Sequence, residues 1–179
     1  MSRLVPMNSR ADIPQKYSGT PVEMLIRYQN FGEPFMEYTD AQILIGMCMD
    51  NRKTLKVPEN FAYVLRTGGG NLRQNEFKVS FAIAVGGVTA IALVGHNNCG
   101  MVHVYSKKDR FIDGMVERAG WTREQATEHF MTLAPLFEIE NEEDFVLSES
   151  HRLRRKYPKI LVAPFIYRLE DNKLYMVEE

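Results

Sequence analysis

Cysteine is scarce in this chain, which has only two cysteines, Cys48 and Cys99, among 179 residues. Small secreted domains held by a framework of disulfides need more cysteines than this, so that class is excluded. One disulfide between the two remains an alternative. In a cytosolic chain, however, a cysteine pair accompanied by His and Asp is more often a metal site.

Long hydrophobic runs are also missing. The longest apolar runs in the sequence are far shorter than the ~20 residues that a membrane-spanning helix requires. The first twenty residues are polar, contain Pro6 and Pro14, and include no apolar segment of the kind found in signal peptides. We therefore expect no membrane role and a reducing cytoplasm as the compartment.

An excess of charge of one sign is absent too: 22 Lys and Arg face 23 Asp and Glu, for a net charge of −1. This balance argues against a general nucleic-acid surface. The basic cluster 152–156 follows the acidic run 140–144 and is expected on a solvated helix face. With 45% hydrophobic and 25% charged residues, the chain is expected to form one globular domain over 1–179.

Two short apolar runs are each followed by residues that can bind a metal or take part in catalysis. Each run is continuous rather than alternating, which is typical of a strand buried on both faces of a parallel sheet. The first run, 43–47, is followed by Cys48, Asp50 and Arg52, and the second, 90–94, by His96 and Cys99. If the two strands are neighbours, their ends lie about 5 Å apart, so these side chains can converge on one ion.

Two thiolates and an imidazole are ligands that zinc prefers, at roughly 2.0 to 2.3 Å. Cys48, His96 and Cys99 would leave a tetrahedral ion with one open position, which distinguishes catalytic from structural zinc. Asp50 is one candidate for the fourth ligand. Water is the other, with Asp50 paired to Arg52 instead.

Three segments together resemble the β-class carbonic anhydrases. They are Cys48-x-Asp50-x-Arg52, His96-x-x-Cys99-Gly100 and the stretch 64–69, and the resemblance extends from about Ala41 to the C-terminus. It implies a zinc enzyme that reversibly hydrates carbon dioxide to bicarbonate, a small-molecule substrate.

The resemblance also implies roles for individual residues. Cys48, His96 and Cys99 would bind zinc, Asp50 and Arg52 would form a catalytic pair, and the backbone at Gly68, Gly69 and Gly100 would border the substrate pocket. Two thiolates cancel the formal charge of the ion, so activity is expected to rise toward alkaline pH. Asp50 would displace water in a closed state by binding the ion itself.

The chain departs from the family pattern in the walls of this pocket. Asn51 stands where the family usually has Ser, and Thr67-Gly68-Gly69 replaces Asn-Ala-Gly. Alternatives therefore stay open: a related zinc hydrolase acting on carbon disulfide or carbonyl sulfide, or a non-catalytic zinc-binding or redox-sensing protein. A nucleotide site at Gly68–Gly70 is disfavoured because no Lys-Ser/Thr follows the glycines.

Of the remaining histidines, His103 is a candidate proton shuttle or a partly exposed structural residue. His129 and His151 are expected to be solvated, and Trp121 to fill a core or an interface.

The pattern of elements predicts an α/β fold. We expect a mainly parallel central sheet with an antiparallel edge strand, helices on both faces and an N-terminal helical arm. The expected strands are 42–49, 61–65, 90–94, 159–167 and 173–177, and the expected helices are 21–30, 74–85, 107–119, 122–137 and 142–156.

The N-terminal part, 1–35, is expected to be an extended arm followed by a helix, with Thr20 as N-cap and Glu23 closing a capping box. Its apolar residues Val22, Leu25 and Ile26 cannot be buried by the arm alone, so it must dock on the main body or on another subunit. The resemblance implies docking across a homodimer or a higher even oligomer.

Overall fold

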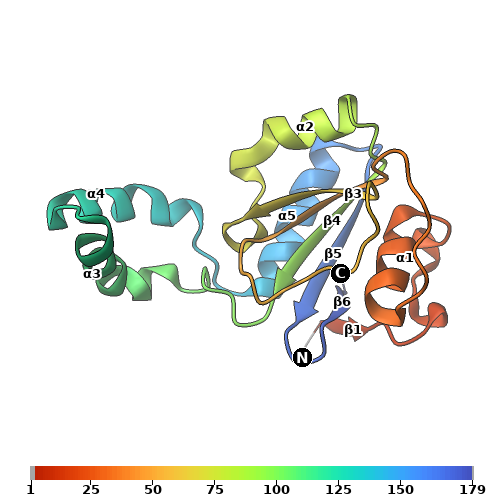
Figure 1. Cartoon of the computed structure of the whole chain (residues 1–179), viewed down its shortest axis with the longest axis horizontal. Helices are drawn as coiled ribbons and strands as arrows, with labels where there is room; N and C mark the ends of the chain where they lie inside the picture. Colours follow the sequence, from red (N-terminus) through yellow and green to blue (C-terminus); the bar gives the residue numbers. More distant parts are fainter. Residues whose placement is uncertain (1–2, 179) are drawn as a thin grey trace.

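A computed structural model describes residues 3–178; Met1 and Ser2 of the expected arm, and Glu179, lie outside the described residues. A six-stranded mixed sheet runs through the centre in the order β1-β6-β5-β4-β2-β3 (Figure 1). The strands are β1 (Leu4–Pro6), β2 (Ile43–Cys48), β3 (Ala62–Thr67), β4 (Ala90–His96), β5 (Leu161–Arg168) and β6 (Lys173–Val177). The α-helices are α1 (Pro21–Ile26), α2 (Glu76–Ala84), α3 (Lys108–Ala119), α4 (Arg123–Leu133) and α5 (Glu142–Lys156).

Four strands, β3, β2, β4 and β5, are parallel, and β6 and β1 are antiparallel additions at one end. The predicted fold class is thereby confirmed. The edge differs from the expectation, because Leu4–Pro6 of the arm pairs outside β6 and makes β1 the edge strand. Pro164 lies in the buried β5, where pairing with β6 begins only at Phe165.

The alternation of side chains along the strands builds a core on each face of the sheet. In β2, Ile43, Ile45 and Met47 point toward α1, whereas Leu44 points toward α2 and α5. Because both faces are covered, β2 and β4 are buried at every position. Figure 1 shows α1 on one side of the sheet and α2 and α5 on the other.

The N-terminal helix packs on the sheet of its own chain. Val22, Leu25 and Ile26 are fully buried in the core that contains the residues of β2. The helix continues as a wider π-helical turn, Arg27–Phe31, and ends at Gly32 with φ +64°. Packing of 1–35 on a second subunit stays a prediction.

The capping box expected at Thr20 is wrong. The Thr20 hydroxyl donates to the carbonyl oxygen of Tyr17, so it does not cap the helix, and Glu23 accepts from Gly19 N–H instead. A capping box does form at Thr122 and Gln125, with both reciprocal hydrogen bonds present.

Helices α3 and α4 form a hairpin that projects from the body of the protein (Figure 1). The hairpin has a small core of its own, with Ile112, Ala126 and Phe130 buried. Its two ends meet beside the sheet, where Val102 bridges to Ile139. Short helical turns complete the chain at Arg10–Asp12, Gln15–Tyr17, Gly68–Gly70, Arg73–Asn75, Val104–Lys107 and Ala134–Leu136.

The α2 helix buries less of its apolar surface than its sequence indicates. Val79 and Ala82 face the core, but Phe77 and Val85 are 81% and 70% exposed, and Phe81 is also exposed. Part of the apolar side of α2 stays uncovered, because the sheet below it ends at β3. This leaves an apolar surface beside that edge strand.

The strand order reverses between β2 and β4. From β2 the chain crosses to β3 on one side, and from β3 it crosses to β4 on the other side of β2. Ligands of open α/β sheets bind outside the carboxyl ends of the strands at such a reversal. Within residues 3–178, no helix is long and apolar enough to cross a bilayer.

The assigned core predicts how far one large-to-small substitution lowers the free energy of unfolding. Phe165→Ala empties a fully buried site in β5 and is expected to lower the free energy of unfolding by about 3–5 kcal/mol. Met36→Ala, at a position 57% exposed, should change it by no more than about 0.5 kcal/mol. Chemical denaturation of both variants measures this, and equal effects would contradict the assigned core.

Candidate metal centre

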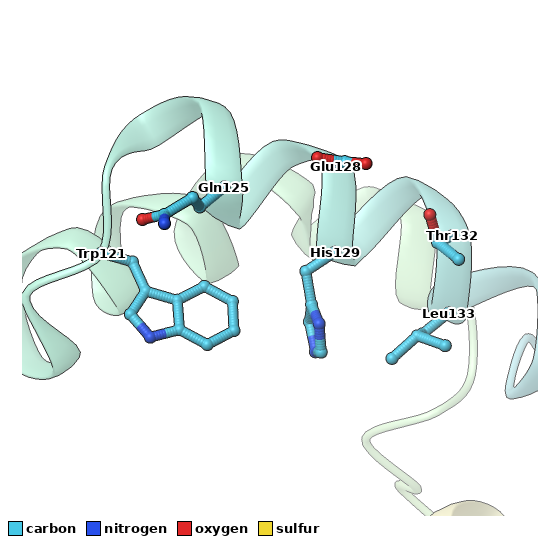
Figure 2. A pocket seen from close by; sticks show the side chains of 6 residues that line it. All are labelled: Trp121, Gln125, Glu128, His129, Thr132 and Leu133. Atoms are coloured by element: carbon cyan, nitrogen blue, oxygen red, sulfur yellow. The ribbon is translucent and has the colours of Figure 1, made fainter.

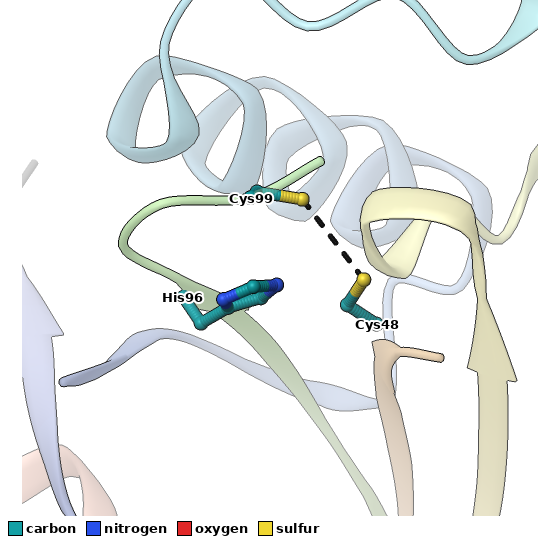
Figure 3. Close-up of side chains that lie close together, drawn as sticks. All are labelled: Cys48, His96 and Cys99. Carbon is teal, nitrogen blue, oxygen red and sulfur yellow. Dashed lines mark hydrogen bonds between the residues drawn. The ribbon is translucent and has the colours of Figure 1, made fainter. Parts of the chain in front are cut away.

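Three predicted ligands come together at the reversal of the sheet. Cys48 ends β2, His96 ends β4, and Cys99 lies in the turn that follows β4. The ligand atoms lie within 4.8 Å of one another, and the two sulfurs are 3.9 Å apart. Figure 3 shows the three side chains pointing toward a common centre. All three are buried, so the group is shielded from solvent.

The hydrogen bonding of His96 leaves one ring nitrogen for a metal. Nδ1 lies 2.9 Å from the carbonyl oxygen of Asn97, which can only accept, so Nδ1 carries the hydrogen. Nε2 therefore presents its lone pair. This atom is buried and has no hydrogen-bond partner among the described residues. A buried acceptor without a partner is costly unless an ion or a water completes it, so the group fits zinc.

The two thiols share one proton unequally. A hydrogen bond from the Cys99 thiol is the main cause that lowers the pKa of the Cys48 thiol to about 3. Burial opposes this effect, and the backbone N–H groups of Asp50 and Gly69 lower the pKa further. The same pairing and burial raise the pKa of Cys99. A cation placed between the sulfurs would take the place of that proton, because metal ligation requires thiolates.

Asp50 and Arg52 form a close pair at the rim of this group. The Arg52 Nε and Nη2 atoms donate to the Asp50 carboxylate at 2.6–3.1 Å, and the Arg52 N–H donates to Oδ1 at 2.9 Å. The guanidinium hydrogen bonds hold the pKa of Asp50 well below its usual range. Oδ2 lies 3.9 Å from His96 Nε2, yet Asp50 is not part of the three-residue ligand group.

Hydrogen bonds tie the two ligand-bearing loops together. Arg52 Nη2 also donates to the carbonyl oxygen of Asn98, 2.9 Å away, in the turn between His96 and Cys99. The Cys99 N–H donates to the carboxylate of Glu142 in the first turn of α5. Sequence reasoning missed Glu142, because nothing in an acidic run distinguishes the carboxylate that turns back toward a ligand.

Sequence reasoning also missed Lys53, which is buried beneath the loop that follows β2. Its ammonium donates to the carbonyl oxygens of Cys48 and Asp50. A lysine next to an arginine is usually solvated. The only signal for a role of Lys53 in the sequence was its position immediately after the Cys48-x-Asp50-x-Arg52 motif.

The predicted pocket glycines have different surroundings. A Cβ on Gly68 would lie 2.9 Å from Phe137, and one on Gly69, where φ is +65°, would lie 2.3 Å from Ile139. Both glycines therefore leave room for side chains of the segment that connects α4 to α5. Nothing lies within 4 Å of a Cβ on Gly100. Their role in binding substrate stays a prediction.

The other three histidines are exposed and do not join the metal-ligand group. His129 lies on α4 in a hollow of the hairpin that Trp121 and Leu133 also line (Figure 2). The Trp121 ring meets the His129 ring edge-on at 5.0 Å. Trp121 thus packs within the hairpin, and His129 and His151 are exposed as expected.

Residues 45–177 match the family model described as carbonic anhydrase, which is most of the chain and includes all three ligand residues. The chain belongs to the β-class carbonic anhydrase family. Members of this family are zinc enzymes, and this one catalyses the reversible hydration of carbon dioxide. The Cys48, His96 and Cys99 group is able to hold the metal.

Several solved structures have the same fold as this chain. A β-carbonic anhydrase from Trichomonas vaginalis matches with a TM-score of 0.66 at 19% identity, over 93% of this chain and 99% of that one. A carbonic anhydrase from Glaciozyma antarctica matches with a TM-score of 0.62 at 17% identity, over 92% and 99%. A carbon disulfide hydrolase matches with a TM-score of 0.56 at 18% identity, over 87% and 86%. A search of curated proteins found no match.

The geometry predicts that His96 is needed to bind metal. His96→Ala removes the unpartnered buried nitrogen, so the purified protein is expected to lose stoichiometric zinc. His129→Ala makes the same change on the exposed hairpin and should leave the zinc content unchanged. Elemental analysis measures both variants, and full zinc occupancy in His96→Ala would contradict the ligand group.

Proposed function

We propose that Cys48, His96 and Cys99 hold the zinc ion of this carbonic anhydrase and that Asp50 and Arg52 are the catalytic pair. The observation that carries the proposal is the buried convergence of two sulfurs and an unpartnered imidazole nitrogen within 4.8 Å, beside an ionised carboxylate.

Zinc, when bound, supplies Lewis acidity that makes water a stronger acid and so a better nucleophile near neutral pH. The chain's own contribution is orientation. Asp50 accepts a hydrogen bond from the attacking hydroxyl group and directs its lone pair toward the carbon of carbon dioxide. An ordinary carboxyl is already ionised at neutral pH, so the main effect of Arg52 there is to fix the direction of the carboxylate.

The Asp50–Arg52 pair also favours the open arrangement over the closed one. Both carboxylate oxygens accept hydrogen bonds from Arg52, and Arg52 is held by the carbonyl oxygen of Asn98. A move of Asp50 onto the ion would break these charge-assisted bonds, which are stronger than neutral ones. With Asp50 held in this way, Cys48, His96 and Cys99 would leave a bound metal accessible to water, and the backbone at Gly100 would border the substrate.

Replacement of Asp50 separates binding of the metal from catalysis. Asp50→Ala removes the orienting acceptor but no ligand, so zinc content should stay stoichiometric while kcat falls on the order of 10²–10⁴-fold. Asp113→Ala, which removes an ion-paired aspartate of the hairpin, is the matched control and should retain full activity.

Stopped-flow carbon dioxide hydration above pH 8 measures this, with carbonyl sulfide and carbon disulfide assayed in parallel. Unchanged turnover by Asp50→Ala would remove Asp50 from the mechanism. Hydrolysis of a sulfur gas without hydration of carbon dioxide would identify the related hydrolase instead.

We further propose a homodimer that forms through the outer edge of β3, with Tyr63, Phe77, Phe81 and Val85 on the α2 side of the sheet and Val64 on the opposite side. These side chains are all exposed and apolar. They adjoin the outer edge of β3, which has no strand partner among residues 3–178. An uncovered apolar edge strand readily pairs with another strand, and a two-fold axis lets β3 pair with its own copy.

Charge at this edge should prevent association. The double variant Val64→Glu, Phe81→Glu is expected to be a monomer where the parent chain is a dimer, because it places like charges across the two-fold axis. Met131→Glu, at an exposed site of the hairpin, is the control. Light scattering after size exclusion measures the mass, and a double variant that remains dimeric would contradict the assigned edge.

We also propose a reducing, cytoplasmic compartment. The sulfurs of Cys48 and Cys99 lie 3.9 Å apart, and both must stay reduced to bind zinc.

A further inference from the structure

Lys53 is the only Lys or Arg side chain that is buried among residues 3–178, at 1% exposure. Burying a cation is costly unless its donors are satisfied and anions lie near. It follows the catalytic Arg52 in the chain but points inward, beneath the loop, whereas the Arg52 side chain is half exposed.

The ammonium of Lys53 holds the loop that carries a ligand and the catalytic carboxylate. Nζ lies 3.1 Å from the carbonyl oxygen of Asp50 and 3.3 Å from that of Cys48. Arg66, from β3, reaches the same two oxygens at 3.2 and 3.4 Å with Nη1, and its Nη2 donates to the carbonyl oxygen of Lys53. Two cations from different elements thus bind the same pair of carbonyls.

Two N–H groups of this loop are also engaged. The Met49 N–H donates to the carbonyl oxygen of Thr67 at 2.8 Å, and the Asp50 N–H bonds the Cys48 sulfur. The carbonyls that Lys53 and Arg66 hold belong to the peptide groups on either side of the one that carries the Asp50 N–H. The Lys53 contacts therefore fix the backbone from which both the Cys48 thiolate and the Asp50 side chain project.

Nearby charges only partly offset the cost of burying Lys53. Burial is the main cause that lowers the pKa of Lys53, and repulsion from Arg66 acts in the same direction, whereas attraction to Cys48, Asp50 and Cys99 raises it. Arg52 already pairs with Asp50, so the contribution of Lys53 to the loop is made through its two carbonyl contacts. A buried cation interacts more strongly than one in water, because the surrounding dielectric screens it less.

We propose that Lys53 is a positioning residue of the zinc centre, holding the carbonyls of Cys48 and Asp50 so that sulfur and carboxylate keep their places around the ion. The inference rests on the proposed function, since the ligand assignment belongs to it. Lys53 touches neither substrate nor metal and acts through the loop. Partners of this kind, one step removed from the ion, typically change metal affinity or activity about 10–100-fold.

The experiment compares Lys53→Met with Lys53→Arg and Lys56→Met. Methionine keeps the length of the buried side chain and removes its charge and donors. Arginine restores both. Lys56 lies in the same loop, and its side chain is exposed, so Lys56→Met makes the same chemical change without the contacts. Each metal-free protein is titrated with zinc against a competing chelator and with Co²⁺, whose absorption spectrum reports the ligand geometry, and its thermal unfolding is measured without metal.

The expected result for Lys53→Met is a zinc dissociation constant raised about 10–100-fold and a changed Co²⁺ spectrum, with unfolding of the metal-free protein close to that of Lys56→Met. Lys53→Arg should recover most of the affinity. Wild-type affinity and spectrum in Lys53→Met would overturn the proposal.

A Lys53→Met protein that is destabilised without metal yet binds zinc normally would also overturn it, by assigning Lys53 a structural role alone. If Lys53→Met does not fold, Lys53→Gln, which keeps a donor without the charge, takes its place under the same two criteria. A parent chain that binds no zinc would contradict the ligand assignment itself, which separates that failure from a failure of Lys53.

Discussion

The parallel pairing of β2 with β4 is the constraint on which the rest of the structure depends. Its register, with Met47 opposite Val94, sets the ends of both strands at the same level. Cys48 and His96 therefore leave the sheet side by side. The topology reverses between these two strands, so no crossover covers their carboxyl ends. A shift of this register by one residue would place Ile45 or Met47 where Gly46 lies, and even a Cβ at that position would lie 2.8 Å from Leu72.

A site built on strand ends still needs its loops held. Arg52 joins the Asp50 loop to the turn at Asn98, and Glu142 fixes the backbone of Cys99 from α5. Lys53 and Arg66 bind the carbonyls on the inner side of the Cys48 loop. These contacts come from β3, α5 and two loops, so the geometry of the centre depends on the packing of the whole sheet and not on the motif alone.

The sequence was sufficient for the parallel strands and for the convergence of Cys48, His96 and Cys99, because continuous apolar runs and ligand chemistry are local signals. It was insufficient where partners are distant in the chain. The strand Leu4–Pro6 is too short to show any periodicity, and it forms by pairing with the edge of β6. The exposure of Phe77 and Val85 follows from the width of the sheet beneath α2, and the burial of Lys53 follows from two carbonyls that no periodicity reveals.

X-ray absorption at the zinc edge of the reconstituted protein tests the central claim most directly. The account predicts a shell with two sulfurs at about 2.3 Å and lighter ligands, one of them imidazole nitrogen, at about 2.0–2.1 Å. Loss of one sulfur from that shell in Cys48→Ser would assign it to the end of β2. A shell without sulfur, or no zinc bound after reconstitution, would contradict the account.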